Sequence, residues 1–132
     1  MPVFLLVGIA GAIGSMLRYG LSLLFPFSGD SFPIATVFAN LLGSFILAYL
    51  LALFSGKRQL SEKLEAMIYI GLLGSFTTFS AFSGETVLLL QNQAYLLAFL
   101  NVFISAAGGF FAALFGFSVG KRALGEGSEA SQ

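Results

Sequence analysis

Four long apolar stretches divide this sequence and limit what it can fold into. Each reaches the length of about 20 residues that a helix needs to cross ~30 Å of hydrocarbon. Because lipid offers the backbone no hydrogen bonds, each stretch must be mainly helical. The sequence therefore predicts an all-α membrane protein with four transmembrane helices. The spans cover residues 3–25, 34–54, 64–90 and 94–119, within one domain over residues 1–124, and a disordered polar tail follows over residues 125–132.

The composition narrows the class of function. Only 9% of the 132 residues are charged, whereas a soluble domain carries about 25%. The chain has no cysteine, which excludes disulfides and thiolate chemistry, and no histidine, the commonest general base and metal ligand. Its six basic and six acidic residues form no basic run that would suit nucleic acid. We therefore expect a membrane protein that is not an enzyme.

The basic residues predict the orientation of the spans. An even number of spans places both termini and the loop between the second and third spans on one side of the membrane. The other side has only Arg18, late in the first span. By the positive-inside rule, the side with more basic residues, which holds both termini, is cytoplasmic. Both termini are therefore expected in the cytoplasm. Its basic residues are Lys57, Arg58, Lys63, Lys121 and Arg122.

The third span is longer than a straight crossing requires. Residues 64–90 would form a helix of ~40 Å at 1.5 Å per residue. Tilting is one explanation. A break is the favoured one, because glycines and the β-branched pair Thr77 and Thr78 weaken the helix there. Unwound backbone near the middle of the membrane would expose carbonyl oxygens that can hold a cation.

The segment GSFTTFSAFSGE, residues 74–85, mixes hydroxyls, a carboxylate and aromatic rings. Phe76, Phe79 and Phe82 recur every three residues, so they are expected to share one helix face. The rings either face lipid or the core, or they present their partially positive edges to a guest. Ring edges interleaved with hydroxyls would suit a small anion better than a cation.

Polar residues also recur on the second and fourth spans. Thr36, Asn40 and Ser44 are four residues apart on one helix face, as are Asn101 and Ser105. They either join helices by hydrogen bonds or bind a polar guest, for which the Asn40 amide offers two N–H donors. A bundle of four helices can bury few such groups alone, so we expect an oligomer.

Two further features concern helix packing and charge. A row of small residues at every fourth position of the fourth span lets two helices approach closely, within a subunit or between subunits. The row is Gly108, Ala112, Gly116 and Gly120. Arg18 is either an anchor that reaches the lipid headgroups or a cation at the mouth of a pore.

Three segments together resemble the Fluc family of fluoride channels, also called CrcB. They are Gly11-Ala-Ile-Gly14-Ser-Met-Leu-Arg18, Asn40-Leu-Leu-Gly43 and Gly74-Ser-Phe-Thr-Thr-Phe-Ser-Ala-Phe-Ser83, the last similar to the family pattern GGxTTFSTFS. The resemblance covers essentially the whole chain. It implies an antiparallel dual-topology homodimer in the plasma membrane of a prokaryote. Two pores along its interface would export cytoplasmic fluoride passively and relieve its toxicity.

The resemblance also implies roles for individual residues. Arg18 would lie at a pore vestibule, and the backbone carbonyls of Gly74 and Thr77 from both subunits would hold a structural Na⁺ at the dimer centre. Two residues depart from the family pattern, since Ser75 replaces its second glycine and Ala81 replaces a threonine. A left-handed backbone at position 75 would strain a serine. The fluoride pathway would comprise Asn40, Thr78, Phe79, Ser80, Phe82, Ser83, Glu85 and Ser105.

Other assignments stay open at this point. A small-multidrug-type exporter of cationic compounds usually needs a carboxylate deep in its first span, where this chain has none, so it would have to use Glu85. A structural or assembly subunit would carry no ion flux. The uneven loop charge also allows the partner to be an oppositely oriented paralogue instead of a second copy.

Overall fold

The computed structural model describes residues 1–56 and 59–129. Within these residues the chain is all-helical, and four helical spans are long and apolar enough to cross a membrane. The first two spans are α1 (Val3–Leu24) and α2 (Ile34–Leu53). The predicted fold class, a multi-pass α-helical membrane protein, is confirmed.

The third and fourth spans are composite. The third contains α3 (Glu62–Glu65), the π-helix η1 (Ala66–Leu73), α4 (Gly74–Phe76) and α5 (Phe79–Gln91). The fourth passes without a break through α6 (Tyr95–Phe103), the π-helix η2 (Ile104–Gly108) and α7 (Gly109–Glu129). π-Helical turns widen a helix and are frequent at functional sites.

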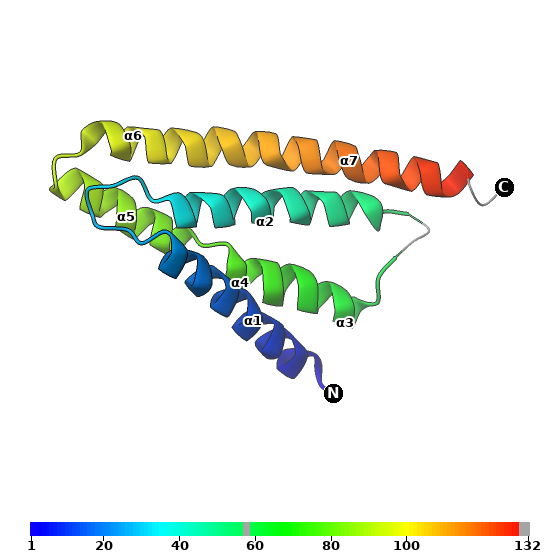
Figure 1. Cartoon of the computed structure of the whole chain (residues 1–132). Coiled ribbons are helices and arrows are strands. Elements are labelled where there is room, and N and C mark those ends of the chain that lie inside the picture. Colours follow the sequence, from blue (N-terminus) through cyan, green and yellow to red (C-terminus); the bar gives the residue numbers. More distant parts are fainter. Residues whose placement is uncertain (57–58, 130–132) are drawn as a thin grey trace.

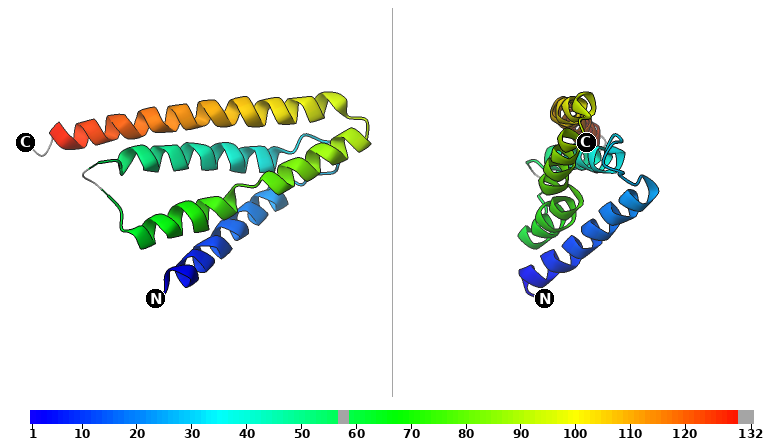
Figure 2. Two further views of the ribbon diagram at one scale, coloured as in Figure 1. Left: turned by 180° about the vertical axis from the view of Figure 1, so that it is seen from behind. Right: turned by 90° about the vertical axis from the view of Figure 1, so that its left-hand side faces the viewer.

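The helices pack as a thin, open bundle. The fourth span lies along α2, the third span lies on the other side of α2, and α1 crosses the third span at an angle (Figures 1 and 2). The α1–α2 loop and the α5–α6 turn lie together at one end of the bundle, away from both chain termini (Figure 1). Asn92 joins these two connections, since its Nδ2 donates to Gly29 O at 2.8 Å.

The row of small residues on the fourth span packs within the subunit. A Cβ on Gly116 would overlap Phe45 O, and one on Gly120 would lie 2.7 Å from Ala52 Cβ. At the other end of the row, a Cβ on Gly108 would approach a Leu41 methyl to 3.0 Å. These glycines therefore set the close approach of the fourth span to α2.

Glycines also set the approach of α1 to the third span. A Cβ on Gly14 would overlap Leu72 O, and one on Gly71 would lie 2.7 Å from Val7 O. Most large apolar side chains point outward instead, Phe4, Phe110 and Phe115 among them. Such exposure suits helices whose outer surface meets hydrocarbon or another chain.

The C-terminal segment differs from its prediction. Helix α7 continues to Glu129, through the first five residues of the tail that was expected to be disordered. Extending an existing helix needs no new nucleus, so a polar sequence can continue it beyond the bilayer. Residues 130–132 and the predicted loop cations Lys57 and Arg58 lie outside the described residues.

Candidate ion pathway

The third span is interrupted at Thr77 and Thr78, where the backbone is extended. Their φ and ψ angles are −80° and 155°, and −153° and 127°. Thr77 donates to Leu73 O from both N and Oγ1, at 3.0 and 2.9 Å, which completes the last turn of the first half. Thr78 Oγ1 accepts from Ala81 N at 3.1 Å and caps α5. The predicted break is thus confirmed, and its position is the threonine pair.

Asn40 on α2 supplies hydrogen-bond partners that the break removes. Its Oδ1 accepts from Thr78 N at 2.7 Å, and its Nδ2 donates to Thr78 O at 2.9 Å. The side-chain amide thereby pairs with the extended backbone as a peptide group of a neighbouring strand would. Because an unpaired backbone group costs several kcal/mol in hydrocarbon, these two bonds stabilise the break. The second N–H of the Asn40 amide can donate to a bound ion or molecule.

Small residues on the neighbouring spans make room for the break. A Cβ on Gly43 of α2 would overlap Thr77 Cγ2, and one on Gly11 of α1 would lie 3.0 Å from Ser75 Oγ. Ser75 itself lies within helical α4. Among the described residues other than glycine, positive φ occurs only at Gln93. Serine in place of the family's glycine is therefore unstrained here.

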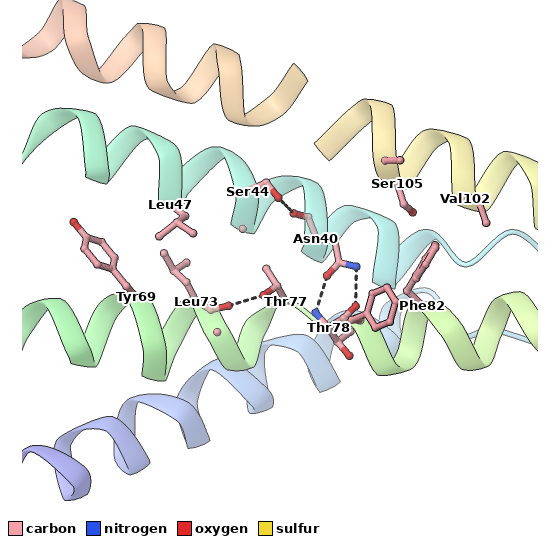
Figure 3. Close-up of a pocket in the computed structure, with 14 residues that line it drawn as sticks. Asn40, Ser44, Leu47, Tyr69, Leu73, Thr77, Thr78, Phe82, Val102 and Ser105 are labelled. Atoms are coloured by element: carbon pink, nitrogen blue, oxygen red, sulfur yellow. Dashed lines mark hydrogen bonds between the residues drawn. The ribbon is translucent and has the colours of Figure 1, made fainter. Parts of the chain in front are cut away.

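A cavity of about 640 Å³ opens beside the break. Figure 3 shows Asn40 and Ser44 reaching it from α2, Thr78 from the link and Ser105 from the fourth span. Its apolar wall includes Tyr69, which the sequence did not single out. Seven predicted site residues line this cavity, namely Asn40, Gly74, Thr77, Thr78, Phe79, Phe82 and Ser105.

The phenylalanine rings do not share one helix face as predicted. The extended pair separates Phe76 from the other two, and Phe76 is buried. Phe79 and Phe82 lie together on α5, with ring centroids 5.7 Å apart and planes tilted by 42°. Phe79 is 80% exposed although it lines the cavity. The expected period of three residues holds only within α5, because a break resets the helical register.

The backbone of the break offers free oxygens. The Gly74 and Thr77 carbonyl oxygens accept no backbone or side-chain hydrogen bond from the described residues. The amide that would pair with Gly74 O in a continuous helix is that of Thr78, which donates to Asn40 instead. Both residues line the larger cavity.

Arg18 and Glu85 line a second, smaller cavity of about 170 Å³ between α1, α2 and α5. Arg18 Nε donates to Ser75 O at 3.2 Å, at the end of the first half of the third span. Glu85 Oε1 accepts from buried Thr36 at 2.7 Å, whereas its Oε2 is buried and has no partner among the described residues. The two predicted polar residues are thus separated from the larger cavity.

The remaining predicted residues line neither cavity. Ser80 is exposed and lies 3.1 Å from the Thr78 hydroxyl, and Ser83 is half-buried. From the sequence, Thr36 and Ser44 are recognisable only as polar residues on one helix face. The Thr36 hydroxyl donates to Glu85 Oε1, and the Ser44 hydroxyl donates to the backbone carbonyl of Asn40. A spacing of four residues revealed the shared face, but it could not reveal the partners.

Comparisons with known proteins identify the family of this chain. Residues 5–117 match the family model of the CrcB-like protein, Camphor Resistance (CrcB). Fluoride-specific ion channel FluC 2 of Listeria monocytogenes serovar 1/2a is 41% identical over 124 residues, which cover 94% of this chain and 95% of the relative. Fluoride-specific ion channel FluC of Shewanella frigidimarina is 47% identical over 102 residues, 76% of this chain and 82% of the relative. FluC 1 of Bacillus cereus strain ATCC 14579 is 40% identical over 130 residues, 95% and 90% of the two chains. The chain belongs to the CrcB family.

Proposed function

We propose that this chain is a fluoride-specific ion channel that passively exports fluoride from the cell. The main support is that the chain belongs to a family whose relatives are named fluoride-specific ion channels. In addition, seven predicted site residues line one cavity. An inside-negative potential contributes ~2.3 kcal/mol per charge per 100 mV to anion exit. Export therefore needs no other energy source.

The larger cavity supports a pathway that discriminates by ligand chemistry and width. The Asn40 amide and the Thr78 and Ser105 hydroxyls supply N–H and O–H donors, and Phe79 and Phe82 supply ring edges. Fluoride holds its hydration water tightly, so several donors must replace that water without binding too strongly for exit. Chloride is larger and gains less from the same donors.

We propose an antiparallel homodimer as the conducting unit. Phe79 has an exposed ring at the lip of a cavity, a position that a second chain would cover. A ring exposed to lipid could not line a water-filled path on its own. An oppositely oriented paralogue could fill the same place, and assembly of the purified chain distinguishes the two partners.

A structural Na⁺ at the dimer centre is also proposed. Hard cations prefer oxygen ligands, and rings of backbone carbonyls replace the hydration shell of alkali ions in channels. The free carbonyl oxygens of Gly74 and Thr77 fit this requirement. Two copies of the chain would provide four such oxygens, and the bound ion would balance the negative ends of their dipoles.

The cellular placement is likewise proposed, as a prokaryotic plasma membrane with cytoplasmic termini. The charge bias of the sequence supports this orientation. An antiparallel dimer of one chain also needs the opposite orientation. Accessibility labelling of a cysteine introduced near Ser128, from each side of the membrane, would measure the ratio of the two.

The test is fluoride efflux, measured with a fluoride electrode, from liposomes that contain only the purified chain. We expect fast fluoride release and no chloride release. Liposomes that retain fluoride would contradict the proposal for this chain acting alone. Proton-coupled uptake of a lipophilic cation by the same liposomes would instead support the multidrug exporter.

A further inference from the structure

A chain of hydrogen bonds connects the fourth span to α5 behind the larger cavity. Asn101 Nδ2 on α6 donates to Thr86 Oγ1 on α5 at 2.9 Å. Thr86 Oγ1 in turn donates to Phe82 O at 2.7 Å. On the other side, Ser105 Oγ lies 3.5 Å from Asn101 Oδ1, in donating geometry. This series of hydrogen bonds therefore ends on two residues that line the cavity, Phe82 and Ser105.

Asn101 is the central member of this hydrogen-bond chain. It is fully buried, with 0% of its surface exposed, and it lines neither cavity. A buried amide costs free energy unless its groups are paired, so its two partners fix the side chain in one orientation. It therefore cannot contact a permeating ion in this arrangement and must act through the residues that it holds.

The position of Asn101 lets it set the width of the cavity. It lies in the last turn of α6, which leads into η2 and Ser105, and it faces α5, which carries Phe82. Phe82 and Ser105 are on different spans and neither is fully buried, so their separation depends on how α5 packs against the fourth span. Hydrogen bonds between membrane helices hold such spacings where apolar packing alone permits sliding.

We propose that Asn101 and Thr86 are positioning residues for halide selectivity, and that they hold Phe82 and Ser105 at a separation suited to fluoride. This inference rests on the proposed channel function. Without the bond from Asn101 to Thr86, α5 and α6 can separate slightly, and a wider path admits chloride. The same separation of α5 and α6 would take fluoride out of contact with Phe82 and Ser105.

The experiment compares Thr86→Val with Thr86→Ser in liposomes. Valine keeps the shape and removes the hydroxyl, whereas serine keeps the hydroxyl. We expect T86V to lower the fluoride-over-chloride permeability ratio about tenfold, as for loss of one hydrogen bond in a site, and T86S to keep the parent ratio. Asn101→Leu removes the amide and should match T86V. Ser55→Ala is the control, because its hydroxyl also joins two spans, donating to Ala52 O of α2 and accepting from Lys121 Nζ of α7, but lies remote from the cavity.

The outcomes separate this inference from the channel assignment. A parent chain without fluoride flux contradicts the channel assignment. A conducting parent together with parent-like selectivity in assembled T86V and N101L overturns the positioning role. Loss of assembly in both variants, or an equal defect in T86S, also overturns it. Hydrogen exchange of α5 provides a readout without flux, in which faster exchange in T86V but not in T86S supports the contact and equal exchange opposes it.

Discussion

Helix α2 makes two contacts that differ in kind. Toward α7 it presents Phe45 and Tyr49, whose carbonyls lie directly against Gly116 and Gly120. Toward the third span it presents the Asn40 side chain, which pairs with the extended backbone at Thr78. The first contact is backbone against backbone at two successive turns, and the second is one amide against one peptide unit.

This difference separates scaffold from site. Closely packed helices have one good fit, since any added atom must push the backbones apart. A break held by one side chain leaves neighbouring oxygens and hydroxyls free for other partners. Helix α2 thus holds the bundle together on one side and holds the irregular backbone of the cavity on the other.

The largest expected effect comes from breaking the α2–α7 contact. Gly116→Ala places a methyl group on Phe45 O, so we expect a loss of roughly 3 kcal/mol or more in stability, as for overpacking of a dense core. Gly8→Ala is the matched control, because a Cβ at Gly8 meets nothing within 4 Å. Thermal unfolding and size-exclusion chromatography, both in detergent, compare the stability of the two variants. Equal stability of the two variants would mean that the contact is adaptable.

Breaking the second contact should affect flux more than assembly. Asn40→Asp still accepts from Thr78 N but can no longer donate to Thr78 O. A carboxylate also repels an anion in the cavity, and together these should lower fluoride efflux about 100-fold or more. Asn92→Asp removes a similar donor, to Gly29 O at the end of the bundle, and should keep flux. Undiminished efflux in assembled N40D would remove Asn40 from the pathway.

The two contacts also differ in how far the sequence predicted them. Hydropathy and span length predicted four helices, and the weak helix formers predicted the break, because both are local properties. The row ending at Gly116 and Gly120 predicted a close helix contact without its partner. The pairs Asn40–Thr78 and Thr36–Glu85 join residues 38 and 49 positions apart, and only the packing of spans determines them. The shared face expected for Phe76 failed because the break resets the register.

Phe79 lies at the cavity but contributes little to the packing of one chain. Its ring is 80% exposed, so Phe79→Ile should leave the stability of the chain nearly unchanged while it removes the ring edge. We expect fluoride efflux to fall about tenfold, in line with one lost aromatic contact. Phe4→Ile, at 74% exposure on α1, is the control. Equal efflux in both variants would place Phe79 against lipid.

The smallest expected effect concerns Arg18, which contacts the break from α1. Its Nε donates to Ser75 O, at the carbonyl end of the first half of the third span, where a cation complements the helix dipole. A cation at a pore mouth would work through charge alone, whereas this bond needs the planar guanidinium. Arg18→Lys keeps the charge, and Arg18→Gln removes it.

If the bond to Ser75 O matters, both variants should lose flux several-fold, which corresponds to about 1 kcal/mol, the net contribution of one typical hydrogen bond. If charge matters, R18K should conduct like the parent, and R18Q should lose flux mainly at low salt, because salt screens the attraction between Arg18 and an anion that is more than ~10 Å away at 0.1 M. Efflux at two salt concentrations distinguishes these results. A salt-independent loss in R18K would assign Arg18 to the same class of contact as Asn40, a side chain that holds the broken backbone in place.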